Sequence, residues 1–124
     1  IDSNQPEVFQ TEDRANQWIA FEFRDMKMKV TSYTLQSYYN GKPNFANPKN
    51  WILEGSDDGR EWVEMDRHED CPDLNNKNAI QNYKIKGDFK EFKYIRVKQI
   101  GKNWANKDQL TLSKVELFGD LYEN

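Results

Sequence analysis

The stretch from Asn50 to Trp62, NWILEGSDDGREW, decides the fold of this chain. It predicts two strands joined by a tight turn at Asp58-Gly59, because glycine adopts a positive φ without steric cost and aspartate tolerates it. Trp51 and Trp62 flank the turn, and two large indoles supply much of the core of a small domain. We therefore expect both tryptophans to be packed inside rather than to contact a ligand. The apolar positions of the two arms are Trp51, Leu53, Gly55, Trp62, Val63 and Met65.

The composition indicates one folded domain. At 124 residues the chain is long enough for a single hydrophobic core and too short for two, so we expect one domain over residues 1–124. Aromatic residues make up 14% of the sequence and all hydrophobic residues only 36%, a balance that suits a thin β-sandwich core filled by large flat side chains. The net charge of −3 argues against a nucleic-acid partner, because phosphate binding needs a clustered basic surplus.

The chain contains a single cysteine, Cys71, so no disulfide can form within it. This favours a cytoplasmic or other intracellular compartment, with a secreted parent protein that does not depend on disulfides as the alternative. No apolar run approaches the length of a membrane span, so we expect no membrane partner. The chain starts at Ile1 without a methionine, which indicates a fragment of a larger protein.

Alternation of apolar and polar residues predicts seven strands and no helix. Outside the central hairpin, the predicted strands are residues 17–23, 29–38, 79–86, 93–99 and 109–119. Parallel neighbours need long crossovers, so these strands imply an all-β, antiparallel sandwich. In the strand at 93–99, Arg96 and the lysines beside it are expected to be solvated. A slip in phase at Ser113-Lys114 predicts a bulge or a change of face there.

The lengths of the connections predict where a ligand binds. If successive strands run alternately up and down, one end of the sandwich receives the short links 24–28, 57–60 and 87–92. The opposite end receives the lead-in 9–16 and the long loops 39–49, 66–78 and 100–108. Long irregular loops carry binding sites more often than tight links do, and the short links look too tight to form a concave site.

We therefore predict a ligand-binding surface at the long-loop end. The candidate residues are Arg14, Tyr39, Asn40, Lys42, Phe45 and Asn103. Aromatic platforms among amide donors can stack on a sugar face or anchor a peptide side chain. One alternative stays open at this stage, in which Phe45 packs under its own loop. Trp104, beside the last strand, is expected to be buried.

No pattern in the sequence indicates catalysis or a cofactor. Cys71 and His68 lie three residues apart, but nothing marks a third orienting group or a cleft, so an ordinary solvated loop is expected. The acidic residues of the same segment are Asp66, Glu69, Asp70 and Asp73. They lack the spacing of a known calcium loop, so no metal is predicted, with a calcium ion as the alternative. Phosphate-binding glycine loops and paired zinc-ligand spacings are also absent from the sequence.

Four motifs in order resemble the factor V/VIII type C, or discoidin, domain. They are a QW(I/L)xxxF-like strand at Trp18, an SxDGxxW hairpin from Ser56 to Trp62, a (Y/F)IR(V/I) strand from Tyr94 to Val97, and an LELFG-like strand from Val115 to Gly119. The resemblance covers residues 8 to 120. It implies a galactose-binding-like jelly-roll sandwich that binds ligands through loops at one end, without catalysis.

The chain departs from the clotting-factor members of that family, which pair a cysteine at each end of the domain. It is more similar to the cysteine-poor intracellular versions attached to BTB or ubiquitin-ligase proteins. The resemblance therefore favours a non-catalytic module that recognises a protein or peptide partner. A carbohydrate-binding module that uses the same loops is the first alternative, and a structural spacer without its own ligand is the second.

Overall fold

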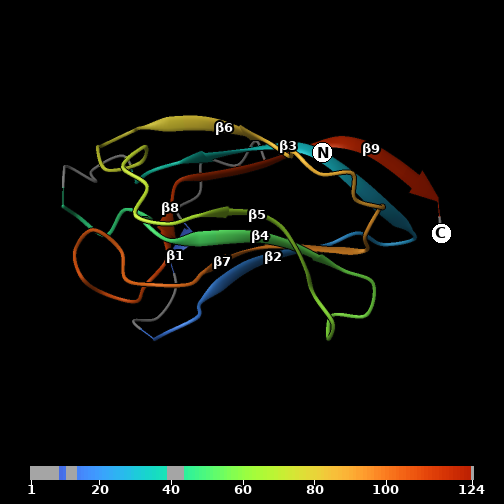
Figure 1. Ribbon diagram of the computed structural model, residues 1–124, viewed down its shortest axis with the longest axis horizontal. Coiled ribbons are helices and arrows are strands. Elements are labelled where there is room, and N and C mark those ends of the chain that lie inside the picture. Colours follow the sequence, from blue (N-terminus) through green and yellow to red (C-terminus); the bar gives the residue numbers. More distant parts are fainter. Residues whose placement is uncertain (1–8, 11–13, 39–43, 124) are drawn as a thin grey trace.

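The computed structural model describes residues 9–10, 14–38 and 44–123, and it is all-β over these residues. The strands are β1 (Phe9–Gln10), β2 (Trp18–Glu22), β3 (Met26–Gln36), β4 (Trp51–Ser56), β5 (Val63–His68), β6 (Ile80–Lys84), β7 (Tyr94–Gln99), β8 (Thr111–Leu112) and β9 (Lys114–Glu123). A four-stranded sheet of order β2-β7-β4-β5 packs against a three-stranded sheet of order β6-β3-β9 (Figure 1). Every strand pairing is antiparallel, which confirms the predicted sandwich.

The central hairpin forms as predicted, with β4 buried at every residue between β7 and β5. Its turn is held by side chains: Ser56 Oγ accepts from the amide of Gly59 at 2.9 Å, and Asp58 Oδ1 accepts from the amide of Arg60 at 2.8 Å. Gly59 has a φ of 76°, a conformation that a side chain disfavours. The Asp-Gly pair therefore shapes the turn through both a backbone conformation and a hydrogen-bonding side chain.

Only the first of the two hairpin tryptophans lies in the core. Trp51 is fully buried and Met65 is nearly so, which confirms half of the prediction. Trp62 precedes β5 and stays outside the core cluster, and Val63 is 43% exposed, so the prediction that both pack inside is wrong. Trp62 lies on the outer face of the four-stranded sheet because its ring stacks on a charged side chain there. The guanidinium of Arg96 is 3.8 Å from the centre of the Trp62 ring.

Arg96 is the centre of a buried charged cluster on that outer face, contrary to the expectation that it is solvated. Its side chain is 12% exposed, and its Nε donates to Glu54 Oε1 at 2.6 Å. The ring of Trp18, which lies on the neighbouring edge strand, is 5.2 Å from the guanidinium on centre. We call these four residues, Trp18, Glu54, Trp62 and Arg96, the arginine cluster. An arginine that points into solvent from a strand and one that is buried against a carboxylate and indole rings have the same alternating sequence pattern. The pattern therefore could not predict which of the two Arg96 would be.

The last predicted strand divides into two. Ser113 separates β8, which pairs with β1, from β9, which pairs with β3. Its amide donates to the carbonyl of Gln36 at 2.9 Å, and its hydroxyl donates to the carbonyl of Ser37 at 2.6 Å. The phase slip at Ser113-Lys114 therefore marks the point where the chain leaves one strand pairing for another.

Two strand boundaries differ from those expected. β3 begins at Met26, inside the expected connection 24–28, and β9 continues past Gly119 to Glu123. The two extensions pair with each other, as in the register Met26↔Glu123, so each supplies the hydrogen bonds that the other needs. β1 also lies within the lead-in 9–16, which was expected to be irregular.

The predicted separation of short links and long loops is confirmed for the residues that the structure describes, while 11–13 and 39–43 lie outside them. At one end, Lys27 and Lys90 both pair with Asp57, and Met28 bridges to Phe92. At the other end, the amide of Trp104 donates to the carbonyl of Asn47 at 3.1 Å, which joins two of the long loops. The described part of the chain contains no helix that is long and apolar enough to cross a membrane.

Candidate functional site

The long loops are fastened to one another by asparagine side chains that point inward. Asn103 is 1% exposed. Its Nδ2 donates to the carbonyl of Gln109 at 2.9 Å, while its Oδ1 accepts from the amides of Ala105 and Lys107 at 2.9 and 3.0 Å. The expectation that Asn103 is a polar surface residue is therefore wrong. An amide that shapes its own loop has the same sequence signature as one that meets a ligand.

Two further asparagines act in the same way. Asn50 donates from Nδ2 to the carbonyl of Lys102 at 2.9 Å and accepts from the amide of Asp70 at Oδ1, also at 2.9 Å. Asn75 Oδ1 accepts from the amide of Asn44 at 2.8 Å. Residues 44–50, 69–78 and 100–109 are thus braced together by amides that are used within the protein. Many of the side-chain amides at this end therefore bond to the backbone of the loops and are not available to a ligand.

Phe45 is the predicted site residue that the structure places at the surface of the long-loop end. Its side chain is 38% exposed and stacks on the ring of Tyr38, with ring centres 5.8 Å apart and planes at 19°. The alternative in which it packs under its own loop therefore does not hold. Asn44, beside it, is exposed. Such a supported aromatic is pre-organised for contact, because its orientation is already fixed.

Of the remaining predicted site residues, the structure describes Arg14 but not the three in 39–42. Arg14 is exposed in the lead-in to β2, where the amide of Gln99 donates to the carbonyl of Gln17 at 2.8 Å and ties this segment to the end of β7. Tyr39, Asn40 and Lys42 lie outside the described residues. Their part in the site remains a prediction.

Trp104 is a feature of this end for which no binding role was predicted. It was expected to be buried and is half-buried. Its Nε1 donates to the carbonyl of Cys71 at 3.3 Å, and the ammonium of Lys49 lies 4.6 Å from its ring centre. Lys49 also pairs with Asp70 at 3.5 Å. An indole at the junction of three loops is thereby oriented at the long-loop end.

His68 ends β5 and belongs to a hydrogen-bonded network, not to a solvated loop as expected. Trp51 Nε1 donates to Tyr33 Oη at 3.0 Å, and Tyr33 donates to Asp66 Oδ2 at 2.5 Å. His68 Nε2 lies 2.9 Å from the same oxygen, and the His68 ring stacks on Trp51 and packs against Tyr83. The network fixes the side of the sandwich between β5 and β6, where a polar hollow of ≈ 360 Å³ opens.

The acidic side chains that were considered for calcium face different partners. Asp66 bonds Tyr33, Asp73 accepts from the Tyr83 hydroxyl at 3.1 Å, Glu69 pairs with Arg67, and Asp70 pairs with Lys49. Among the residues that the structure describes, no three acidic, histidine or cysteine side chains gather as a metal site would require. These carboxylates brace the loop by separate contacts.

Burial in this region changes the acidity of three groups. It raises the pKa of the Tyr33 and Tyr83 hydroxyls above the ordinary value of 10.0, and that of the Cys71 thiol above 9.0. Cys71 packs against the core, so the solvated loop expected for it is also wrong. Activated nucleophilic cysteines have a lowered pKa, so the direction found here is opposite to that of a catalytic thiol.

Stability is expected to fall at high pH. Groups with a raised folded-state pKa keep their protons longer in the fold, so their contribution is intact below about pH 9 and is lost as the unfolded chain deprotonates above it. The loss is up to ~1.4 kcal/mol per pH unit for each group. Urea unfolding followed by circular dichroism at several pH values measures it. A midpoint that stays constant from about pH 8 to pH 11 would contradict these shifts.

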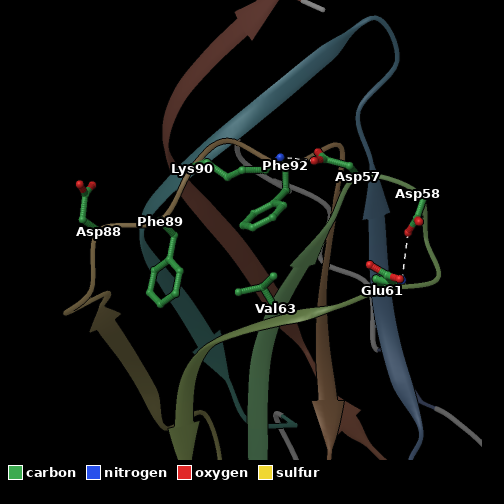
Figure 2. Close-up of a pocket in the computed structure, with 8 residues that line it drawn as sticks. All are labelled: Asp57, Asp58, Glu61, Val63, Asp88, Phe89, Lys90 and Phe92. Atoms are coloured by element: carbon green, nitrogen blue, oxygen red, sulfur yellow. Dashed lines mark hydrogen bonds and ion pairs between the residues drawn. The ribbon is translucent and has the colours of Figure 1, made fainter.

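The short-link end contains a hollow that was not predicted from the sequence. It has a volume of ≈ 320 Å³. Figure 2 shows Val63, Phe89 and Phe92 around it, with Asp58 and Glu61 on one side. The expectation that these links are too tight for a concave site is therefore wrong. Two phenylalanines three residues apart in the otherwise charged link 87–92 were the available signal. We call this hollow the short-link pocket.

The family model for the F5/8 type C domain matches residues 1–113. The chain belongs to this family. The F5/8 type C assignment confirms the family resemblance: three of the four motifs lie inside the match, and the fourth, from Val115 to Gly119, follows it. Domains of this family are binding modules that are typically non-catalytic. The chain is also 29% identical over 113 residues to the E3 ubiquitin-protein ligase Ufd4 of Drosophila melanogaster. That match covers 88% of this chain and 4% of the ligase, so it concerns a small part of the larger protein.

Solved structures share the sandwich of this F5/8 type C domain. CpGH89CBM32-5 from Clostridium perfringens, in complex with GalNAc-β-1,3-galactose, superposes with a TM-score of 0.70 at 11% identity, over 92% of this chain and 76% of that one. The lectin domain of lectinolysin, complexed with Lewis B antigen, gives 0.62 at 21% identity, over 91% and 72%. Likenesses at these identities establish the common fold.

Proposed function

We propose that this F5/8 type C domain is a non-catalytic recognition module that binds a protein or peptide partner through its long-loop end. The observation that carries the proposal is Phe45, an exposed aromatic held in place by Tyr38 among loops that are braced together. Anchors of this kind dominate the energetics of protein interfaces. The half-buried Trp104 belongs to the same loop end, within reach of the backbone of 44–50.

The use of the loop amides favours a protein over a sugar. A glycan site needs several polar groups that converge on the hydroxyls of the sugar. Here the side chains of Asn50, Asn75 and Asn103 bond to the backbone of neighbouring loops. Phe45, an exposed aromatic among the described residues of this end, suits contact with an apolar peptide side chain.

Glycan binding is the second candidate, and one observation favours it. Asn44 is exposed directly beside Phe45, and an aromatic flanked by an amide can stack on a sugar face. The two carbohydrate-bound structures described above adopt the same fold. A screen of peptides and glycans therefore has to include both classes.

We further propose that the module works inside a larger intracellular protein, of the ubiquitin-ligase or BTB type, without nucleic acid as a partner. The similarity to a short part of Ufd4 supports the ligase setting, and the lone Cys71 supports a reducing compartment. The raised pKa of that thiol and the use of His68 and Asp66 inside a hydrogen-bonded network support a role without catalysis.

Replacing Phe45 by alanine is expected to weaken binding by about 1–3 kcal/mol, because the exposed ring supplies the anchor. The ligand is first selected on a peptide and glycan array and then mapped by NMR chemical shifts. Tyr122→Ala is the matched control, because Tyr122 is an aromatic of similar exposure on β9, and it should leave binding unchanged. Shifts confined to residues 57–61, with none on Phe45 or Trp104, would place the site at the other end.

A further inference from the structure

We propose that the short-link pocket is a second binding site, which takes a cationic side chain, arginine before lysine, from a peptide segment of a partner protein. This site lies at the end of the sandwich opposite to the long loops and does not depend on the function proposed for them. The residues that line it are Asp57, Asp58, Glu61, Val63, Asp88, Phe89, Lys90 and Phe92.

The floor of the pocket is apolar. Phe92 is buried against Gly55, where an added Cβ would lie 2.3 Å from the ring, so the ring cannot move toward the sheet. Val63 is 43% exposed and Phe89 is half-buried. Val63 and Phe89 offer exposed apolar surface to the stem of a long side chain, and the buried Phe92 lines the pocket with them.

Two carboxylates beside this floor lack a cation partner among the residues that the structure describes. Asp58 is fixed by the turn, where one oxygen accepts from the amides of Arg60 and Glu61 at 2.8 and 2.9 Å. The other oxygen accepts no described hydrogen bond, and the side chain of Glu61 forms no described ion pair. These backbone hydrogen bonds lower the pKa of Asp58, so it is ionised at neutral pH.

The remaining acids of the pocket are already neutralised. Asp57 pairs with Lys27 and Lys90, and Asp88 pairs with Lys29 at 3.0 Å. The four acids of the pocket thus face three ammonium groups, which leaves one uncompensated negative charge on the side of the apolar floor where Asp58 and Glu61 lie (Figure 2). An anionic or purely apolar ligand would leave it unpaired.

Lys90 shows how this pocket can hold a cation, between a carboxylate and an aromatic ring. The ammonium of Lys90 contacts the carboxylate of Asp57 and lies 5.5 Å from the centre of the Phe92 ring. A cation is thus held between a carboxylate and an aromatic face within the pocket. Asp58 and Glu61 offer two carboxylates at the edge of the same apolar floor, across the pocket from Phe89, without a resident cation (Figure 2). A planar guanidinium bonds carboxylates through paired donors, so arginine fits two carboxylates on the same side of the floor better than lysine does.

The test uses three short capped peptides that differ only at the central position, which is arginine, lysine or the neutral isostere citrulline. Each is titrated into the isotopically labelled domain, and binding is followed by NMR. We expect the arginine peptide to shift the amide signals of residues 61–63 and 88–92 with the lowest Kd. The lysine peptide should bind more weakly, and the citrulline peptide weakest, by about fivefold or more.

Glu61→Gln is the decisive variant, because it removes one exposed charge and keeps the shape of the side chain. It should weaken the arginine peptide by about fivefold, whereas Asp120→Asn, an equal change of charge at an exposed position on β9, should not. Phe45→Ala should also leave this binding unchanged, so the outcome is independent of the long-loop site. Equal affinity for the arginine and citrulline peptides, or an unchanged Kd in Glu61→Gln, would overturn the proposal.

Discussion

Replacing Trp51 by alanine is expected to lower the free energy of unfolding by about 3–5 kcal/mol, the usual cost of emptying a large core site. The indole is fully buried in the middle of the four-stranded sheet. It stacks on His68 with ring centres 4.9 Å apart, meets the edge of Tyr83 and donates to the hydroxyl of Tyr33. Its removal leaves a cavity and also an unpaired position in the network that includes Asp66.

Urea unfolding followed by circular dichroism measures this loss. Trp51→Phe keeps most of the volume and should cost less than the alanine variant. Trp62→Ala serves as the matched control, because that ring covers Arg96 on the surface and its loss should cost about 1–2 kcal/mol. If Trp51→Ala cost less than about 1 kcal/mol, or no more than Trp62→Ala, the hairpin would not anchor the core.

Removal of one member of the pair formed by Glu54 and Arg96 is expected to cost about 3–5 kcal/mol, because the remaining charge stays buried without its partner. The two side chains are only 8% and 12% exposed, so solvent screens their interaction weakly. Glu54→Ala leaves a guanidinium beneath Trp62, and Arg96→Ala leaves a carboxylate in the sheet.

A double-mutant cycle tests this coupling. The variant that lacks both side chains should be more stable than the sum of the two single losses implies, since it contains no unpaired buried charge. Lys98→Ala on the same strand is the control, and we expect an effect within about 0.5 kcal/mol. Additive losses would mean that the pair contributes no coupling and that its contact is incidental.

The sequence predicted the features of the fold that follow from local patterns. Alternation in 17–23 separates Ile19 and Phe21 from Trp18 on opposite faces, and the structure packs the first two against the core and exposes the third. The Asp58-Gly59 turn likewise predicted the central hairpin. Loop lengths predicted which connections meet at each end. These inferences succeeded because period, turn chemistry and chain direction are read from neighbouring residues.

What the sequence missed depends on contacts between distant residues. Asn103 and Phe45 were equal candidates for ligand contact, yet the first is enclosed by its own loop and the second is exposed. Trp62 was predicted to lie in the core because no residue near it in the sequence indicates that its ring packs on Arg96. The short-link pocket arises where Val63 meets the separate link 87–92, a meeting that neither segment encodes alone.

The four tryptophans lie in different parts of the domain and can serve as intrinsic fluorescent probes of those parts. Trp51 lies in the core, Trp18 and Trp62 lie on the outer sheet face against Arg96, and Trp104 lies among the long loops beside Lys49. The core, the outer sheet face and the long-loop end thus each contain at least one indole, in three different surroundings. A variant with phenylalanine at the other three positions would emit from Trp104 alone, so ligand capture at the loop end could be followed by fluorescence without an attached dye.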